Sequence, residues 1–158
     1  MRSPLGGLLI RRFEAGQAEE VSQLIVSNLL QVNVRDYGEA VVQQLARFYT
    51  PEFVLNYAQA GEMLVALAGA GLVGTATLER EWVRNVFVSI DQHRRGIGRL
   101  LMGQIEDAAR WQALPRLRLR ANTAAVDFYQ KLGYLPVELL EERVGDALLK
   151  TMRMEKAL

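Results

Sequence analysis

One stretch of the chain, residues 86–101, has the residue types and spacing of an anion-binding turn. A β-branched and aromatic run typical of a strand is followed by a basic loop, and Gly96 and Gly98 then precede a helical apolar pattern. Glycines let the backbone approach a ligand closely, and the first N–H groups of a helix have no intrahelical partners. Such donors suit a phosphate, so we expect this turn to hold the pyrophosphate of a cofactor. Positive charge nearby comes from Arg94, Arg95 and Arg99.

Composition excludes several classes of function. The 158 residues are expected to form a single domain, 1–158, with a sizeable core. A net charge of +1 argues against a nucleic-acid partner. No apolar run approaches the roughly 20 residues that cross a bilayer, and residues 1–10 lack a signal-peptide core, so no membrane partner and a cytoplasmic location are expected. One histidine and no cysteine argue against a metal site.

The periodicity of the chain predicts a mixed α/β fold with the order β-α-α-α-β-β-β-α-β-α-β-β. Strands are expected at 8–13, 63–67, 72–78, 82–88, 116–121, 134–140 and 147–156. Helices are expected at 18–30, at 39–49, from Gly98 to about Ala113, and at 124–132. A further short helix is expected to begin at Pro51, with Thr50 as its N-cap. Turns or loops are expected at 33–38, 68–71, 79–81 and 141–146. The sequential strands between 63 and 88 are predicted to form an antiparallel meander.

Two separated segments together resemble the GCN5-related N-acetyltransferase (GNAT) superfamily. The segment 92–98 is similar to the family's Gln/Arg-x-x-Gly-x-Gly/Ala acetyl-CoA signature, and it follows an expected strand. The segment 122–134 resembles the family's Asn-x-x-Ala-x-x-x-Tyr-x-x-x-Gly-Phe/Tyr pattern. Either motif alone is weak, but both occur in the right order, and the close match covers about 82–137. The chain departs from the signature at one position: His93 stands where the family has Gln or Arg, and Gln92 lies one residue earlier. Because backbone N–H groups mainly hold the phosphate in such loops, we expect acetyl-CoA binding to tolerate this change.

The resemblance implies a fold and a reaction. The fold is a predominantly antiparallel sheet with a splayed parallel central pair, 82–88 and 117–121, and helices on both faces. Acetyl-CoA is the implied acyl donor, its pantetheine lying between the splayed strands and pairing with the backbone of Val86, Phe87 and Val88 in the manner of an added strand. The implied cofactor-binding set is Val86, Phe87, Val88, His93, Arg94, Arg95, Gly96, Ile97, Gly98, Arg99, Asn122, Ala125 and Tyr129.

Catalytic groups are also carried over by the resemblance. Tyr129 occupies the position of a tyrosine whose hydroxyl faces the coenzyme sulfur as general acid, although an aromatic at helical spacing is more often core. Glu79 and Glu81 are candidate bases, or simple turn charges, and Asn85 could orient a water. His93 is a tempting base as the only histidine, but its loop position places it at the phosphate end. Asn122 is a helix N-cap, a cofactor ligand, or both.

Two further groups of residues leave open alternatives. Arg116, Arg118 and Arg120 share one strand face, which is either solvated or interfacial, or else a site for an acidic acceptor or a coenzyme phosphate. The helical segment before the second strand usually forms the acceptor wall in this family. The aromatic and acidic residues of this segment either pack in the core or line an acceptor pocket. The candidates for the pocket are Asp36, Tyr37, Phe48, Tyr49 and Tyr57, together with Trp82 from a later strand.

Four functions compete. The leading one is direct acetyl transfer from acetyl-CoA to a primary amine of a small molecule or amino-acid-like acceptor. Protein acetylation at an N-terminus or lysine is the second, and a non-catalytic acyl-CoA-binding regulatory module is the third. A dinucleotide-binding domain is disfavoured, because its fingerprint needs a glycine or alanine where Leu101 stands. A homodimer is possible, as is common in the family.

Overall fold

The computed structural model describes residues 7–69 and 71–158. Most of the segment tested above for a signal peptide, and Ala70 in the 68–71 turn, lie outside the described residues. In the part of the chain that the structure describes, none of the helices combines the length and apolar character needed to cross a bilayer.

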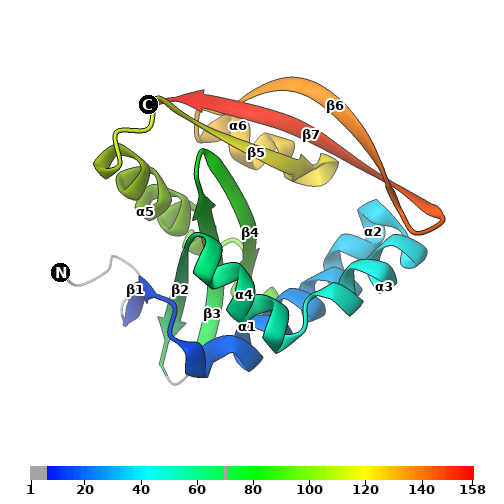
Figure 1. Cartoon of the computed structure of the whole chain (residues 1–158), viewed down its shortest axis with the longest axis horizontal. Coiled ribbons are helices and arrows are strands. Elements are labelled where there is room, and N and C mark those ends of the chain that lie inside the picture. The colour runs from blue at the N-terminus through cyan, green and yellow to red at the C-terminus, as the bar shows by residue number, and fades with distance from the viewer. Residues whose placement is uncertain (1–6, 70) are drawn as a thin grey trace.

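A seven-stranded sheet forms the centre of the structure, with the order β1-β2-β3-β4-β5-β7-β6. Every neighbouring pair is antiparallel except β4 and β5, as the sequence analysis predicted. The strands are β1 (Leu8–Arg12), β2 (Glu62–Ala68), β3 (Gly71–Glu79), β4 (Trp82–Val88), β5 (Arg116–Asn122), β6 (Leu135–Val144) and β7 (Ala147–Ala157). Figure 1 shows β5, β7 and β6 diverging from the strands β1–β4.

The parallel pair stays together for only two residues. Trp82 lies opposite Arg118 and Val83 opposite Leu119, and no further pair follows. A bulge on the other edge of β4 accompanies this divergence: the register with β3 shifts between Thr75 and Thr77. Asn85 lies at this irregularity with φ +55, a left-handed value that asparagine tolerates better than most residues. The sheet is therefore splayed at its centre.

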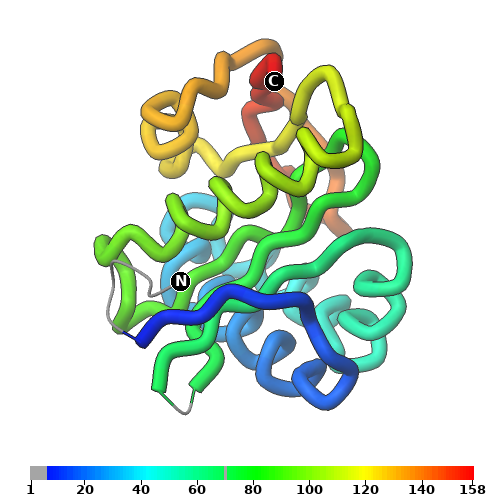
Figure 2. The backbone as a smooth tube through the Cα atoms, turned by 90° about the vertical axis from the view of Figure 1, so that its left-hand side faces the viewer, coloured from blue at the N-terminus to red at the C-terminus, as the bar shows by residue number. Residues whose placement is uncertain are grey.

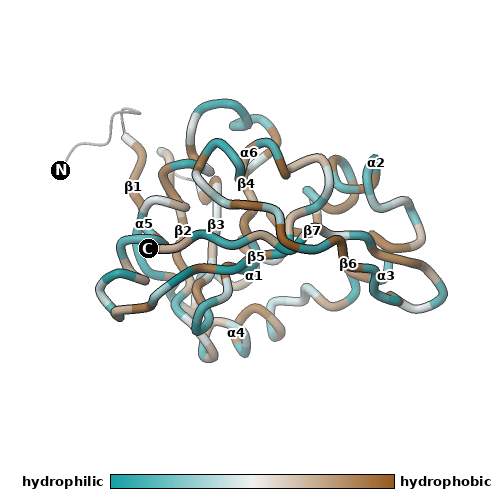
Figure 3. Tube along the Cα trace, turned by 90° about the horizontal axis from the view of Figure 1, so that it is seen from above, coloured by the Kyte–Doolittle hydropathy of each residue, from teal (hydrophilic) through white to brown (hydrophobic). Residues whose placement is uncertain are grey.

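Helices cover both faces of the sheet. On one face lie α1 (Ala18–Asn28), α2 (Val34–Tyr37), α3 (Glu39–Phe48) and α4 (Pro51–Ala60); on the other lie α5 (Ile97–Trp111) and α6 (Val126–Lys131). Short turns are η1 (Ala15–Gln17), η3 (Ile90–Gln92) and η4 (Thr123–Ala125), and a π-helical segment, η2 (Leu29–Asn33), joins α1 to α2. Figure 2 shows α5 and the α1–α4 helices on opposite sides of the strands. Hydrophobic and hydrophilic residues alternate along α3 and α4 (Figure 3).

The two faces bury two separate hydrophobic clusters. Strand β2 contributes to both, because alternate side chains of a strand point to opposite faces. Met63 and Val65 pack with α1, α3 and α4, while Leu64 and Ala66 pack on the α5 side. This double burial explains why β2 reads as a continuous apolar run rather than an alternating one.

Local signals placed most helix ends correctly. Thr50 caps α4, its hydroxyl oxygen accepting from the Phe53 N–H at 3.1 Å, and Pro51 is the first helical residue. Helix α5 lies close to β3 because Gly74 has no side chain. A Cβ there would meet Leu101 Cδ1 at 2.9 Å, so Gly74 fixes the distance between α5 and the sheet.

Two sequence expectations were wrong. The segment 33–38 is not a loop: it continues α1 through η2 and α2 as far as Tyr37, and Gly38, with φ +84, ends it. The turn expected at 141–146 is also shorter, since β6 runs to Val144 and β7 starts at Ala147. Charged residues there belong to an exposed hairpin, in which Glu141 pairs with Lys150 at 3.8 Å. Their polarity reflects exposure rather than a turn.

Replacing Leu101 with alanine tests the packing of α5 on the sheet. Leu101 is 0% exposed, so Leu101→Ala is expected to lower the free energy of unfolding by about 2–5 kcal/mol. Trp111 lies on the same helix but is 91% exposed, so Trp111→Ala should change the free energy of unfolding by less than about 0.5 kcal/mol. Urea denaturation of both variants measures the difference, and equal losses would contradict the described packing.

Candidate active site

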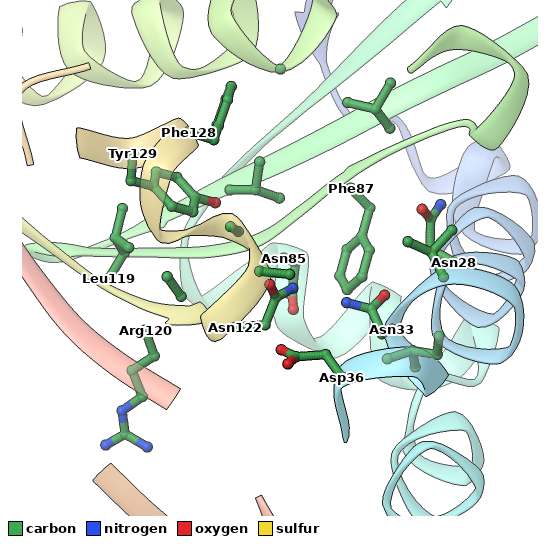
Figure 4. A pocket seen from close by; sticks show the side chains of 18 of the residues that line it. Asn28, Asn33, Asp36, Asn85, Phe87, Leu119, Arg120, Asn122, Phe128 and Tyr129 are labelled. Atoms are coloured by element: carbon green, nitrogen blue, oxygen red, sulfur yellow. The ribbon is translucent and has the colours of Figure 1, made fainter. Parts of the chain in front are cut away.

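A cavity of about 870 Å³ opens where β4 and β5 diverge. Its walls come from α1, η2 and α2 on one side, and from β5, α6 and the β6–β7 hairpin on the other. The start of α5 and its preceding loop line one end, and the edge of β4 runs along the middle (Figure 4). The cavity therefore joins the two sequence motifs, which are separated along the chain.

The glycine turn lies at one end of the cavity with the geometry expected of an anion site. Gly96 is the N-cap of α5 with φ +79, and the Leu100 N–H donates to its carbonyl oxygen at 3.1 Å. This is the first hydrogen bond of the helix. The N–H groups of residues 97–99 come before it in the chain, so no helical carbonyl is available to accept from them. Gly98 lies close to α6: a Cβ there would meet Phe128 Cζ at 3.2 Å, which is a tight contact.

The side chains around this turn divide into two groups. His93, Arg94, Gly96, Ile97, Gly98 and Arg99 line the cavity, together with Gln92. Arg95 is not among the lining residues; its Nη1 donates to Gln92 Oε1 at 3.3 Å. The His93 ring bonds through Nε2 to the Val88 carbonyl oxygen at 2.8 Å, which makes Nε2 the donor. His93 thus fastens the loop to the end of β4.

Strand β4 presents its edge to the cavity. Val86, Phe87 and Val88 all line it, as the resemblance implies for the pantetheine contacts. The neighbouring Asn85 lines it too, and its Oδ1 accepts a hydrogen bond from the Tyr49 hydroxyl at 3.0 Å. Because that oxygen is engaged by Tyr49, the amide nitrogen of Asn85 keeps its donors for other partners.

Tyr129 and Asn122 meet the cavity from β5 and α6. Tyr129 is 8% exposed, its ring packs edge-on against Phe128 and Tyr134, and Figure 4 shows its hydroxyl pointing into the cavity. Burial raises the pKa of this hydroxyl, and the nearby Tyr37 raises it further, so it stays protonated at neutral pH. Asn122 occupies the N-cap position of η4, but its side chain makes no capping bond; its buried Oδ1 has no partner among the described residues. Ala125 also lines the cavity.

The two glutamates proposed as bases do not line the cavity. Glu79 Oε2 accepts from the Tyr57 hydroxyl at 2.9 Å and pairs with Arg84 Nε at 3.3 Å. Glu81 Oε2 lies 3.4 Å from Arg116 Nε and 3.5 Å from Arg118 Nε. Both carboxylates are thus engaged in ion pairs, and the two partners of Glu79, Tyr57 and Arg84, themselves line the cavity. The sequence had no means of showing where the turn between β3 and β4 points.

The arginine face of β5 is matched by glutamates from neighbouring strands. Arg118 also pairs with Glu155 at 3.3 Å, and Arg120 pairs with Glu142 at 3.3 Å. Trp82 lies beneath three guanidinium groups, with ring-centre distances of 5.2 to 5.9 Å to Arg84, Arg118 and Arg120. This arrangement favours an ion-paired surface over an open site for an anion, although Arg120 itself reaches the cavity.

The acceptor wall contains some of the expected residues and several others. Asp36, Tyr37, Tyr49 and Tyr57 line the cavity, whereas Trp82 does not and Phe48 is 57% exposed. Sequence reasoning missed the further lining residues Asn28, Val32, Asn33, Glu142, Leu149 and Thr151. One usable signal was Asn28, a polar residue in the apolar stripe of α1, which is buried and donates to the Leu24 carbonyl at 3.0 Å. Over residues 7–69 and 71–158, no cluster of side chains suits a metal ion.

Two glycines of the α5 region give a matched test of the turn. Gly96→Ala places a side chain at φ +79 and is expected to cost about 1–2 kcal/mol of stability. Gly103 is an exposed helical residue of α5 with open space around it, so Gly103→Ala should stabilise the protein by about 0.5–1 kcal/mol. Urea denaturation distinguishes them, and a stabilising Gly96→Ala would show that the turn does not require a left-handed residue.

Comparison with known proteins agrees with this geometry. A family model described as an acetyltransferase (GNAT) domain matches residues 33–158. Among curated proteins, none matches the chain.

Solved structures share the fold over nearly the whole chain. A GCN5-related N-acetyltransferase of Rhodopseudomonas palustris superposes with a TM-score of 0.91 at 20% identity, covering 100% of both chains. The PaiA N-acetyltransferase of Thermoplasma acidophilum, in complex with coenzyme A, superposes with a TM-score of 0.78 at 20% identity, and the match covers 96% of this chain and 99% of that chain. YncA of Salmonella typhimurium, a putative acetyltransferase with its cofactor acetyl-CoA, superposes with a TM-score of 0.69 at 16% identity, and the match covers 97% of this chain and 95% of that chain. At these identities the likeness establishes the fold. Because the family model matches residues 33–158, the chain belongs to the GNAT acetyltransferase family.

Proposed function

We propose that this protein transfers an acetyl group from acetyl-CoA directly to the primary amine of a small molecule or amino-acid-like acceptor. The observation that carries the proposal is the cavity, which runs from the N–H groups of the glycine turn, along the unpaired edge of β4, to the Tyr129 hydroxyl. Membership of the GNAT family supports the reaction type. The PaiA and YncA structures, which contain coenzyme A and acetyl-CoA, support the donor.

The donor would be held mainly by backbone groups. The N–H groups at the start of α5 suit the pyrophosphate, and Arg94 and Arg99 border the same end of the cavity. The edge of β4 at Val86–Val88 has no strand partner on the β5 side, so its N–H and C=O groups are available to the pantetheine amides. The unpartnered Oδ1 of Asn122 is a buried acceptor at the same strand divergence. The residues present therefore fit this donor.

Tyr129 serves as the general acid in this proposal. The acceptor nitrogen attacks the thioester carbon, the C–S bond breaks, and the sulfur takes the tyrosine proton. The Tyr129 hydroxyl, like any phenol of ordinary pKa, is protonated at physiological pH, and burial raises its pKa further, so it still carries the proton that the departing sulfur takes. Positioning by the cavity walls lowers the barrier further. Glu79 and Glu81 are not given a role, because neither side chain lines the cavity and both carboxylates are engaged in ion pairs.

The shape of the acceptor end favours a small molecule over a protein. The tip of the β6–β7 hairpin lies against α3: a Cβ on Gly145 would be 3.2 Å from Gln44 Cδ. Figure 1 shows this tip beside α2 and α3. The contact closes one side of the acceptor end, which leaves less room for a polypeptide. A cytoplasmic location, a single domain over 1–158 and a possible homodimer stay predictions.

Release of thiol from acetyl-CoA tests the proposed activity. We expect release with some members of a panel of small primary amines, and little with lysine peptides or peptides with a free N-terminus. The measurement is the free thiol formed over time, with mass spectrometry of the acetylated product. Binding of acetyl-CoA without thiol release from any acceptor would favour the regulatory module, and faster turnover of peptides would favour protein acetylation.

Removing the Tyr129 hydroxyl tests the general acid. Tyr129→Phe is expected to lower kcat by about 100-fold or more, because the departing sulfur loses its proton donor, while the Kd for coenzyme A stays unchanged. Tyr134→Phe is the matched control: Tyr134 packs against Tyr129, and its buried hydroxyl has no partner among the described residues. This control should keep full activity. Full activity of Tyr129→Phe would rule out the assignment.

A further inference from the structure

In the proposed reaction, no residue has yet been assigned to accept the proton that the acceptor amine loses. An acceptor amine arrives as an ammonium ion and must lose protons as it forms the amide. Apart from tyrosines and arginines, the titratable side chains that line the cavity in the described part of the chain are Asp36, His93 and Glu142. Each can be judged by its position and by the partners it already has.

Two of these three groups are poorly placed to receive an ammonium. His93 belongs to the loop before α5, and its Nε2 already donates to the Val88 carbonyl oxygen at 2.8 Å. Glu142 lies on the exposed β6–β7 hairpin, and its Oε2 is paired with Arg120 Nη1 at 3.3 Å. An acceptor ammonium would have to displace Arg120 to use that carboxylate.

Asp36 differs from both in position and in partners. Its Oδ1 accepts a hydrogen bond from the Thr123 hydroxyl at 2.5 Å, which is a neutral donor and leaves the negative charge uncompensated. No ion pair is recorded for Asp36 among residues 7–69 and 71–158. Figure 4 shows its carboxylate directed into the cavity, toward Asn122 at the end of β5. The second oxygen of Asp36 is thus open to a ligand.

The backbone fixes this carboxylate across the mouth of the cavity. The π-helical segment η2 leads into α2, a single turn that Gly38 ends with φ +84. Thr123 belongs to η4, on the opposite wall, so the Thr123–Asp36 bond joins the two sides. π-helical segments are rare, and many occur at functional sites.

Within the described residues, the cavity's tyrosines and the arginines of β4 and β5 do not cancel the negative charge of Asp36. Tyr37 and Tyr129 are neutral phenols at physiological pH, and burial raises the pKa of both hydroxyls; the charge of Asp36 raises the pKa of Tyr37 further. The cavity arginines of β4 and β5, Arg84 and Arg120, are matched by Glu79 and Glu142. Arg35 is the other charged residue of α2. The acceptor end therefore favours a cation.

Resting on the proposed function, we infer that Asp36 binds the ammonium group of the acceptor and takes a proton from its nitrogen during acetyl transfer. The ammonium first loses one proton to solvent and becomes a neutral nucleophile. As the N–C bond forms, the nitrogen becomes more acidic and passes a second proton to Asp36. The C–S bond breaks with its electron pair on sulfur, which takes the Tyr129 proton. The proton on Asp36 then restores Tyr129 through solvent, so the products are the amide, the thiol and one proton.

The test uses the full chain saturated with coenzyme A, and n-butylamine at pH 7 as the probe. Asp36→Asn keeps the shape of the side chain and an oxygen for Thr123. We expect it to weaken butylammonium binding, followed by NMR, by about ten-fold or more. With any amine that wild type acetylates, kcat should fall by about 100-fold, and Asp36→Glu should recover part of it.

The control removes the same charge nearby. Glu39 begins α3 three residues further on and does not line the cavity, so Glu39→Gln should leave binding and turnover within two-fold of wild type. Equal butylammonium binding by wild type and Asp36→Asn, or none by wild type, would overturn the inference. Failure of the proposed function is a separate result: wild type would then bind no acetyl-CoA or release no thiol, whatever its affinity for the ammonium.

Discussion

The early end of the β4–β5 ladder is the constraint on which the site depends. After Val83 and Leu119, both strands carry backbone N–H and C=O groups that no neighbouring strand receives. Buried backbone polar groups need partners, so a divergence of this kind is stable only where water or a ligand can supply them. The bulge at Asn85 bends β4 away from β5 and brings a left-handed residue to the cavity wall. The sheet thus gives up ladder bonds at its centre, and the cavity is the result.

Close packing around α5 makes this divided sheet a rigid frame. Gly74 lets Leu101 approach β3, and Gly98 lets the Phe128 ring lie against the first turn of α5. The first contact fixes α5 on the sheet, and the second fixes α6 against α5. These contacts place Tyr129 on the element packed against the glycine turn, although about 30 residues of chain lie between them. A cofactor that spans both ends meets preformed walls, which lowers the entropic cost of binding.

Charge is distributed unevenly along the cavity. Arginines and helix N–H groups occur at the glycine turn, whereas the arginines of β4 and β5 farther along are matched by Glu79, Glu81 and Glu142. The tyrosines there are neutral at physiological pH, and burial raises their pKa values still further above it. One end therefore suits a polyanion and the other a cation, which is the polarity that a coenzyme and an amine need if they are to meet in the middle.

The sequence by itself determined the elements whose signals are local. A β-branched and aromatic run predicted β4 to the residue, the Thr50–Pro51 pair placed the start of α4, and the glycine spacing placed the start of α5. These features arise from neighbouring residues, so one chain segment contains all the information. Tertiary structure decided the rest: that 33–38 continues a helix and carries Asp36 into the cavity, that Glu79 and Glu81 form ion pairs with arginines, and that the Asn122 side chain makes no capping bond. Each of these depends on contacts between residues far apart in the chain, such as Thr123 and Asp36, which no local pattern encodes.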